Sequence, residues 1–322
     1  MKVGLAGQGA FGVKHLEAMA NIPGIEVITL TGGNQVRTGE VAKKFNIPHF
    51  TGDLAESLKQ PGLEAVILAT PTGMHAKQGE MCMRAGKHVQ VEIPIADSLA
   101  DSELLDRVQR ETGVVCMGGH TRRFNPSHQY VHNKIKAGEL MIQQMNVQTY
   151  FFRRENINVQ GQARSWTDHL LWHHACHTVD LFQYQTGQLV SDCYAVQGPI
   201  HPQLGIAMDI GVVMKVPSGA ICTLSLSFNN NGPQGTFFRY IGDSGTYLAH
   251  YDDLTDGNGQ KIDLSKVAVS MNGIELQDRE FFEAIKEKRE PNASVAQCLT
   301  AMQVLDKLEK ILNSSAKATS NV

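Results

Sequence analysis

The opening residues constrain the fold more than any other part of the chain. An apolar run, Met1–Ala6, leads directly into Gly7, Gly9 and Gly12, which have the spacing G-x-G-x-x-G, and a helical stretch follows at Val13–Ala20. Gly7 permits a tight turn, Gly9 lets a pyrophosphate approach the backbone, and Gly12 lets helix and strand pack closely. Free N–H groups at the helix start would meet the phosphate charge. A strand, a turn and a helix in this order predict a dinucleotide-binding unit; a glycine-rich turn without a ligand is the weaker alternative.

The bulk composition excludes several classes of protein. With 322 residues, of which 42% are hydrophobic and 19% charged, the chain has the size and composition of a two-domain globular protein. A formal net charge of −3 gives no reason to expect a nucleic acid or a membrane surface as partner. No uncharged apolar run is long enough to span a bilayer. The six cysteines lack C-x-x-C spacing, so we expect reduced thiols in a cytoplasmic protein.

Strand and helix signals alternate through the first third of the chain. Such repeated β-α-β units predict a parallel, doubly wound sheet, that is, an α/β Rossmann domain. We expect this dinucleotide-binding domain to cover residues 1–119 and to end at Gly118-Gly119-His120. The expected elements after the first helix are strands at Ile25–Leu30, Ala65–Ala69, His88–Val91 and Val114–Met117, and helices at Val36–Phe45, Gln78–Ala85 and from Ser98, as N-cap, to Arg110.

The pattern changes in residues 120–322, which we expect to bind substrate and to mediate oligomerisation. Many strand-like runs are separated by turn signals such as Pro217-Ser218-Gly219, which predicts an α+β domain with an open, mostly antiparallel sheet. Few helices are available to cover that sheet, so we expect a homodimer that forms through it. The expected strands are Gln144–Arg153, Cys193–Gln197, Met208–Val216, Ala220–Phe228, Thr236–Gly242 and Thr246–His250, and the expected helices lie near Pro126–Ala137, His169–Gln185, Glu275–Lys288 and Val295–Leu312.

The segment after the second strand indicates which nicotinamide cofactor is preferred. Thr31-Gly32-Gly33-Asn34 lacks the carboxylate that usually holds the ribose 2′-hydroxyl, whereas Arg37 and Thr38 follow closely and can reach a phosphate. We therefore expect NADP, with NAD as a weaker alternative; an Arg37 that is only solvated would remove this argument. Besides the three glycines, the residues expected to contact the cofactor are Ala10, Phe11, Thr31, Gly33, Arg37, Thr38, Thr70, Pro71, His75 and Glu92.

A histidine-rich segment, Asp168–Asp180, carries the candidate catalytic residues. On an α-helix, His173 and His177 are four positions apart and share one face. Such a pair suits acid–base catalysis beside a nicotinamide or ligation of a metal ion. Metal hydrolase motifs of this spacing need a Glu beside the first His, where this chain has His174, so we expect no metal. Hydrogen-bonded structural histidines remain an alternative, and the sequence does not decide between His173 and His177 as the general base.

Arginines form a second candidate group. A guanidinium matches a carboxylate in a bidentate pair, so several converging arginines would bind an anion such as a small dicarboxylate. Surface salt bridges, for example at Arg154, are the alternative for any one of them. The expected substrate-binding residues are Arg122, Arg123, Arg153, Arg164, Trp166 and Asp168.

Several motifs taken together resemble one family over nearly the whole chain. They are the opening glycines, Ala69-Thr70-Pro71 with His75, Lys87-His88-Val89, Arg123-Phe124-x-Pro126, and His177-x-x-Asp180. This set resembles the glucose–fructose oxidoreductase/inositol dehydrogenase (Gfo/Idh/MocA) family. The resemblance implies a nicotinamide-dependent dehydrogenase that combines a Rossmann domain with an open mixed sheet and is oligomeric.

The chain departs from the family pattern at two positions. It has Glu92-Ile93-Pro94 where the family usually has Glu-Lys-Pro, whose lysine assists proton transfer, and His173 where the family tends to have Asp. These departures resemble members that use NADP to oxidise the cyclic hemiacetal of a ring-opened aromatic semialdehyde to a pyrone dicarboxylate. A hemiacetal hydroxyl is more acidic than an ordinary alcohol, so a histidine base suffices. A sugar or cyclic-polyol dehydrogenase, or a non-catalytic NADP-binding sensor, are the alternatives.

Overall fold

The chain divides into two compact units. The computed structural model describes residues 1–157, 161, 163 and 167–319. The first unit combines Met1–Phe124 with Asn272–Leu299, and the second combines Asn125–Met271 with Thr300–Val322. This differs from the contiguous boundary expected after residue 119, because a helix near the C-terminus, α8 (Gly273–Glu287), packs against α1 (Ala10–Met19) in the first unit. Buried Phe281 and Phe282 provide part of the apolar surface of that helix.

Among the described residues of the first unit, six strands form one parallel sheet in the order β3-β2-β1-β4-β5-β6. The Rossmann architecture expected from the sequence is thereby confirmed. Since the strand order reverses between β1 and β4, ligands are expected at the carboxyl ends of the strands on either side of that point. The strands are β1 (Lys2–Ala6), β2 (Glu26–Thr31), β3 (His49–Thr51), β4 (Leu63–Leu68), β5 (His88–Val91) and β6 (Cys116–Gly118).

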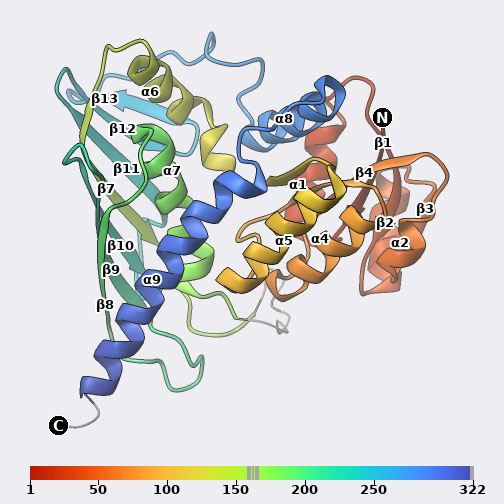
Figure 1. Ribbon diagram of the computed structural model, residues 1–322, viewed down its shortest axis with the longest axis horizontal. Coiled ribbons are helices and arrows are strands. Elements are labelled where there is room, and N and C mark those ends of the chain that lie inside the picture. The colour runs from red at the N-terminus through yellow and green to blue at the C-terminus, as the bar shows by residue number, and fades with distance from the viewer. Residues whose placement is uncertain (158–160, 162, 164–166, 320–322) are drawn as a thin grey trace. The chain divides into compact units, whose positions relative to one another are not determined.

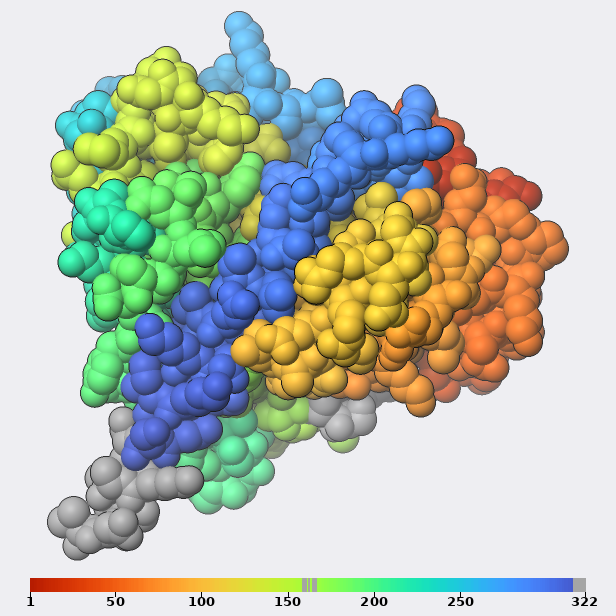
Figure 2. Space-filling model, viewed as in Figure 1, coloured from red at the N-terminus to blue at the C-terminus, as the bar shows by residue number. Residues whose placement is uncertain are grey.

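The helices of the first unit begin and end at residues suited to those positions. Ser98 caps α5 (Leu99–Thr112) by accepting a hydrogen bond from the Asp101 N–H, and Gly113 ends it in the left-handed region. Helices α4 (His75–Arg84) and α5 pack together and lie side by side at the surface of this unit (Figures 1 and 2). The remaining helices are α2 (Gln35–Lys44), α3 (Leu54–Ser57) and the 3₁₀ turns η1 (Thr72–Met74) and η2 (Thr121–Arg123).

Within the described part of the second unit, seven strands form a sheet in the order β13-β12-β11-β7-β10-β9-β8. Strands β7 and β10 are parallel, and the other neighbouring pairs are antiparallel, as the sequence predicted. The strands are β7 (Ile142–Tyr150), β8 (Asp192–Gln197), β9 (Asp209–Lys215), β10 (Ile221–Ser227), β11 (Gly235–Gly242), β12 (Thr246–His250) and β13 (Asp253–Asp256).

Within the described part of the chain, helices cover one face of this second sheet and leave the other uncovered. The covered face packs against the π-helix η3 (Leu170–Ala175) and α7 (Cys176–Thr186), which lie on one side of the strands together with α6 (Pro126–Lys136) (Figure 1). On the uncovered face, Tyr194, Val196 and Val213 are 58%, 56% and 48% exposed. The last helix, α9 (Val295–Thr319), contributes its beginning to the first unit and the rest to the second.

Two further expectations concern membranes and thiols. None of the described helices has both the length and the apolar character required to cross a membrane. The structure records no disulfide among the described residues, and every cysteine except Cys193 is buried. Burial raises the pKa of the Cys82 thiol to about 12, so this thiol stays protonated and unreactive at neutral pH.

Candidate cofactor and catalytic sites

The glycine turn leaves room for a ligand at one of its three glycines. A Cβ on Gly12 would lie 1.8 Å from the carbonyl oxygen of Gly7, and a Cβ on Gly7, at φ +115°, would lie 2.2 Å from that of Ala69. Close packing therefore requires both residues to be glycine. A Cβ on Gly9 would meet no atom within 4 Å, and Gly9 is the N-cap of α1 without a side-chain cap. The open space lies at a helix N-terminus, so the turn fits the pyrophosphate of a dinucleotide.

The turn between β2 and α2 fits an anion. The described first turn of α2 has no acidic residue, and the Asn34 side chain caps it by accepting the Arg37 N–H at 3.1 Å. The Thr38 hydroxyl donates to the carbonyl of Asn34 at 2.6 Å, so it stabilises the turn. A Cβ on Gly32 would lie 2.3 Å from Oε1 of Gln8. The positive end of the helix dipole is thus not neutralised by a carboxylate of its own first turn.

His75 joins the loops that follow β4 and β5. Its Nε2 lies 2.8 Å from the carbonyl oxygen of Thr70, and its Nδ1 lies 2.9 Å from that of Pro94. The Thr70 hydroxyl donates to Gln78 at 2.6 Å. Burial lowers the pKa of His75, which keeps the ring neutral. His75 is only 1% exposed, so its visible role is to support the loops rather than to contact a ligand.

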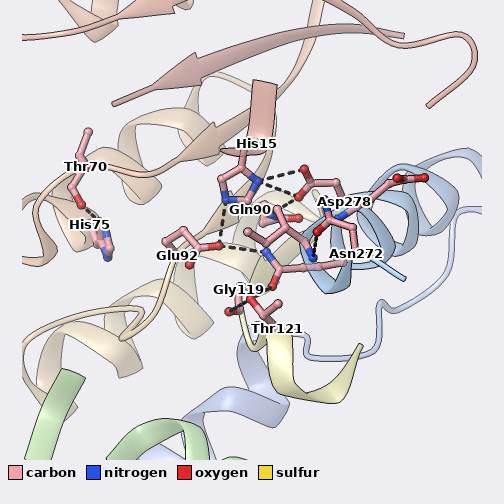
Figure 3. Close-up of polar contacts among 12 residues, drawn as sticks. His15, Thr70, His75, Gln90, Glu92, Gly119, Thr121, Asn272 and Asp278 are labelled. Carbon is pink, nitrogen blue, oxygen red and sulfur yellow. Dashed lines mark hydrogen bonds and ion pairs between the residues drawn. The ribbon is translucent and has the colours of Figure 1, made fainter. Parts of the chain in front are cut away.

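Glu92, which directly follows β5, belongs to a buried cluster that the sequence did not reveal (Figure 3). Nε2 of His15, on α1, lies 3.1 Å from Oε1 of Glu92. Nδ1 of the same ring lies 3.0 Å from both carboxylate oxygens of Asp278, on α8. Gln277 donates to Glu92 at 2.9 Å, and Gln90 donates to Asp278 at 2.8 Å. We call His15, Glu92 and Asp278 the buried triad.

The triad holds a charged imidazole. Burial by itself lowers the pKa of His15, but Asp278 and Glu92 outweigh it and raise the pKa to about 10. Burial raises the pKa of Asp278, and the protons donated by His15 and Gln90 oppose that rise. His15 is therefore protonated at neutral pH. The sequence signal that could have pointed to His15 is its position three residues after Gly12; in the structure it lies on the buried face of α1.

The histidine-rich segment of the second unit is not a uniform α-helix. A π-helix covers Leu170–Ala175, and α7 begins only at Cys176. A π-turn holds more residues than an α-turn, so the shared face expected for His173 and His177 does not follow from their spacing. Short π segments are frequent at functional sites. His169 caps the segment, because its Nδ1 accepts the Leu171 N–H at 3.2 Å.

His173 and His177 differ in their surroundings. Nδ1 of His173 accepts the backbone N–H of His169 at 2.9 Å, so the neutral ring carries its proton on Nε2. His173 can then donate a hydrogen bond from Nε2 but cannot accept a proton there. His177 lies in the first turn of α7 and is half-buried.

Arg153 and Asp168 form an ion pair in the second unit, with side chains 15% and 10% exposed. The guanidinium lies 4.8 Å from the centre of the Phe228 ring, and Nε2 of His174 lies 3.9 Å from the same Asp168 carboxylate. The structure thus brings two of the expected substrate-binding residues together. A guanidinium held by one carboxylate is oriented to bind another.

The other expected substrate-binding residues are placed differently. In the first unit, buried Arg123 donates to Asn292 at 3.0 Å and to Gln297 at 2.7 Å. These contacts stabilise the fold of that unit and do not indicate substrate binding. Arg122 is half-buried in the same unit. Arg164 and Trp166 lie outside the described residues. In the described ranges, no group of three or more His, Cys, Asp or Glu residues is arranged to hold a metal ion.

Comparisons with known proteins agree with both units. Residues 1–120 match the oxidoreductase family with an NAD-binding Rossmann fold, and residues 126–268 match the C-terminal domain of bacterial oxidoreductases. The chain is 62% identical, over 96% of its length and 98% of the relative's, to 4-carboxy-2-hydroxymuconate-6-semialdehyde dehydrogenase of Sphingobium sp. strain SYK-6. It is 33% identical to the NAD⁺-dependent scyllo-inositol 2-dehydrogenase of Bacillus subtilis, over 44% of this chain and 41% of that one.

Solved structures agree on the fold. A levoglucosan dehydrogenase in complex with NADH has a TM-score of 0.84 at 20% identity, covering 98% of this chain and 97% of its own. The oxidoreductase domain protein of Kribbella flavida has a TM-score of 0.85 at 19% identity, covering 97% of each chain. With the fold, the glycine turn and the high identity to one dehydrogenase in agreement, the chain belongs to the oxidoreductase family with an NAD-binding Rossmann fold and is an NAD(P)-dependent dehydrogenase.

Proposed function

We propose that this protein uses NADP to oxidise the cyclic hemiacetal of 4-carboxy-2-hydroxymuconate-6-semialdehyde to 2-pyrone-4,6-dicarboxylate, a step of aromatic catabolism by protocatechuate 4,5-cleavage. The observation that carries this proposal is the 62% identity, over 96% of the chain, to a dehydrogenase named for that semialdehyde. The Arg153–Asp168 pair supports it, because the substrate bears two carboxylates. The absence of the family's lysine at Ile93 also agrees, since an acidic hemiacetal hydroxyl needs less help from a base.

The oxidation removes a hydride from the hemiacetal carbon and a proton from its hydroxyl, and the C–O bond becomes the carbonyl of the lactone. The nicotinamide, when bound, accepts the hydride. His177 takes the hydroxyl proton. His173 donates a hydrogen bond from Nε2 to a substrate oxygen, and its ring is fixed by the His169 N–H. Arg153, oriented by Asp168, binds one substrate carboxylate.

The test is an assay of the purified protein with NADP and the hemiacetal, following NADPH by its near-ultraviolet absorbance. We expect turnover with the hemiacetal and none with inositols or aldoses. Turnover of a polyol or sugar, without turnover of the hemiacetal, would mean that the proposed substrate is wrong. The match to scyllo-inositol 2-dehydrogenase makes inositols the first compounds to include. Cofactor binding without turnover of any of these substrates would instead support a sensor.

Arg37 is expected to determine the preference for NADP. Replacing it with alanine should raise the KM for NADP by about tenfold or more and leave that for NAD within about twofold, because only NADP has the 2′-phosphate that a guanidinium pairs with. Arg84→Ala is the matched control, since Arg84 is also on the first unit but pairs with Glu80 and Glu111. Equal changes for both cofactors would argue against the assignment.

Arg153 is expected to contribute to substrate affinity. Arg153→Lys keeps the charge and loses the fork, so the KM for the hemiacetal should rise about tenfold while the KM for NADP is unchanged. Arg154→Lys serves as control, because Arg154 is exposed, lies over the Phe152 ring and donates to Asn229. A rise in KM in the control but not in Arg153→Lys would reverse the assignment.

We also propose that two copies associate through the uncovered face of the second sheet. Tyr194 of β8 lies opposite Val213 of β9, and with Val196 they place apolar surface on that face. Wild-type protein should sediment as a dimer at micromolar concentration, and Val213→Glu should shift it to a monomer. Val269→Glu places the same charge on a residue outside the sheet that is 83% exposed, and should remain dimeric. A monomeric wild type would exclude this interface.

A further inference from the structure

The buried triad of His15, Glu92 and Asp278 has no part in the proton transfer described above. We propose that its charge makes the protein bind the oxidised nicotinamide cofactor more tightly, relative to the reduced form, than it otherwise would. This inference rests on the proposed function for its choice of cofactor. It assigns His15 and Asp278 as positioning residues that act through Glu92, and it concerns cofactor binding in the absence of substrate.

The position of Glu92 is the first argument. The residue follows β5 directly, and β5 neighbours β4, which flanks the point where the strand order reverses. That edge of the sheet is where a Rossmann fold binds its dinucleotide. The glycine turn that fits the pyrophosphate precedes His15 on the same helix. In the triad, Glu92 is the member that reaches the surface: its side chain is 10% exposed, whereas those of His15 and Asp278 are 0% exposed.

The count of charges is the second argument. The triad contains two carboxylates and one imidazole, so with His15 protonated it carries one excess negative charge. The other side chains that donate to its carboxylates, Gln90 and Gln277, are neutral amides. Burial lowers the pKa of His75 more than the nearby Glu92 carboxylate raises it, so the His75 ring is neutral and adds no charge. A buried charge is screened much less than one on the surface, so this one acts over several ångströms.

The rigidity of Glu92 is the third argument. A Cβ on Gly119 would lie 2.3 Å from Oε1 of Glu92 and 3.0 Å from Oε2, so the Gly119 backbone packs directly against the carboxylate. His15 and Gln277 hold Oε1 from other directions. Gln277 is held in turn, because its Oε1 accepts the Thr121 hydroxyl at 2.7 Å. The carboxylate therefore cannot rotate away when a cofactor binds.

The consequence follows from the chemistry of the nicotinamide. The oxidised ring carries a positive charge and the reduced ring is neutral. A fixed negative charge at the carboxyl edge of the sheet stabilises the bound oxidised ring and does not stabilise the reduced ring. The charge would thus raise the affinity for the oxidised cofactor that the enzyme needs and leave the affinity for the reduced product unchanged.

The experiment measures dissociation constants for NADP⁺ and NADPH without substrate, using NADPH fluorescence and competition by NADP⁺. Glu92→Gln removes the excess charge and leaves His15 paired with Asp278, whose carboxylate makes the larger contribution to the raised pKa of that ring. We expect the ratio Kd(NADP⁺)/Kd(NADPH) to rise about tenfold, since a unit charge acts over several ångströms at an effective dielectric constant near 20. Asp106→Asn, a loss of another buried carboxylate in the first unit, should leave the ratio unchanged.

A second variant keeps the inference testable if Glu92→Gln does not fold. Glu92→Ala removes the same charge from the partly exposed member, without an amide beside His15, and should shift the ratio in the same direction. A ratio unchanged in the variants that fold, or equal losses of affinity for both cofactor forms, would overturn the inference. Failure of the proposed function looks different: the wild type would then leave the hemiacetal unchanged in the NADP assay, while the ratio of dissociation constants could still be measured. Parallel titrations with NAD⁺ and NADH apply the same comparison if only the cofactor preference is wrong.

Discussion

Gly9→Ala will weaken NADP binding by about tenfold or more and leave the Tm of the cofactor-free protein unchanged. Gly12→Ala will instead lower the free energy of unfolding of the first unit by ~1–3 kcal/mol. The two glycines belong to one motif, but Gly9 is required by the ligand and Gly12 by packing within the protein. A methyl group on Gly9 meets nothing within 4 Å in this chain and its φ of −71° suits any residue, so only a bound phosphate would clash with it. A methyl group on Gly12 would lie 1.8 Å from the Gly7 carbonyl oxygen, and that backbone cannot move aside without opening the turn.

Thermal unfolding without cofactor and titration with NADP separate the two effects. Gly198→Ala is the matched control, because its new methyl group would come no closer than 3.6 Å to a neighbour in the second unit. This variant should change neither the Tm nor the affinity. If Gly9→Ala binds NADP as the wild type does, the pyrophosphate does not lie on this turn, and the proposed mode of cofactor binding is wrong.

The fold was predictable because its signals are local. Strand and helix periods, the Ser98 cap and the glycine turn each depend on a few neighbouring residues, and the expected Rossmann domain is confirmed. Strands β3 and β13 were missed because they are short and largely polar, so no alternation can develop. The return of α8 to the first unit was also missed, since it depends on packing against α1 rather than on any signal within residues 273–287.

The site was predictable as a set of residues but not as an arrangement. The spacing of His173 and His177 assumed α-helical geometry, and a π-helix intervenes. The proton position on His173 depends on a backbone N–H four residues earlier, which no composition or motif specifies. The buried triad joins α1, the end of β5 and α8, which are brought together only by the tertiary fold (Figure 3). Glu92 could be named from its motif, whereas its partners could not.

The two histidines should respond differently to the same substitution. Glutamine at position 173 still offers an N–H to a substrate oxygen, so His173→Gln should lower kcat only about tenfold, the range of one lost or weakened hydrogen bond. Glutamine at position 177 cannot accept a proton. The difference rests on the His169 N–H, which occupies Nδ1 of His173 and leaves its Nε2 protonated.

His177→Gln should therefore lower kcat by about 10²- to 10⁴-fold, the usual contribution of a general base, with the Kd for NADP unchanged. Steady-state kinetics with the hemiacetal and a separate NADP titration measure the two quantities. His201→Gln is the control: that histidine lies in a loop of the second unit, where its Nδ1 accepts backbone N–H groups, and its loss should affect neither quantity. If His173→Gln shows the larger loss of kcat, the proton acceptor is His173, and its ring must rotate away from the His169 N–H when substrate binds.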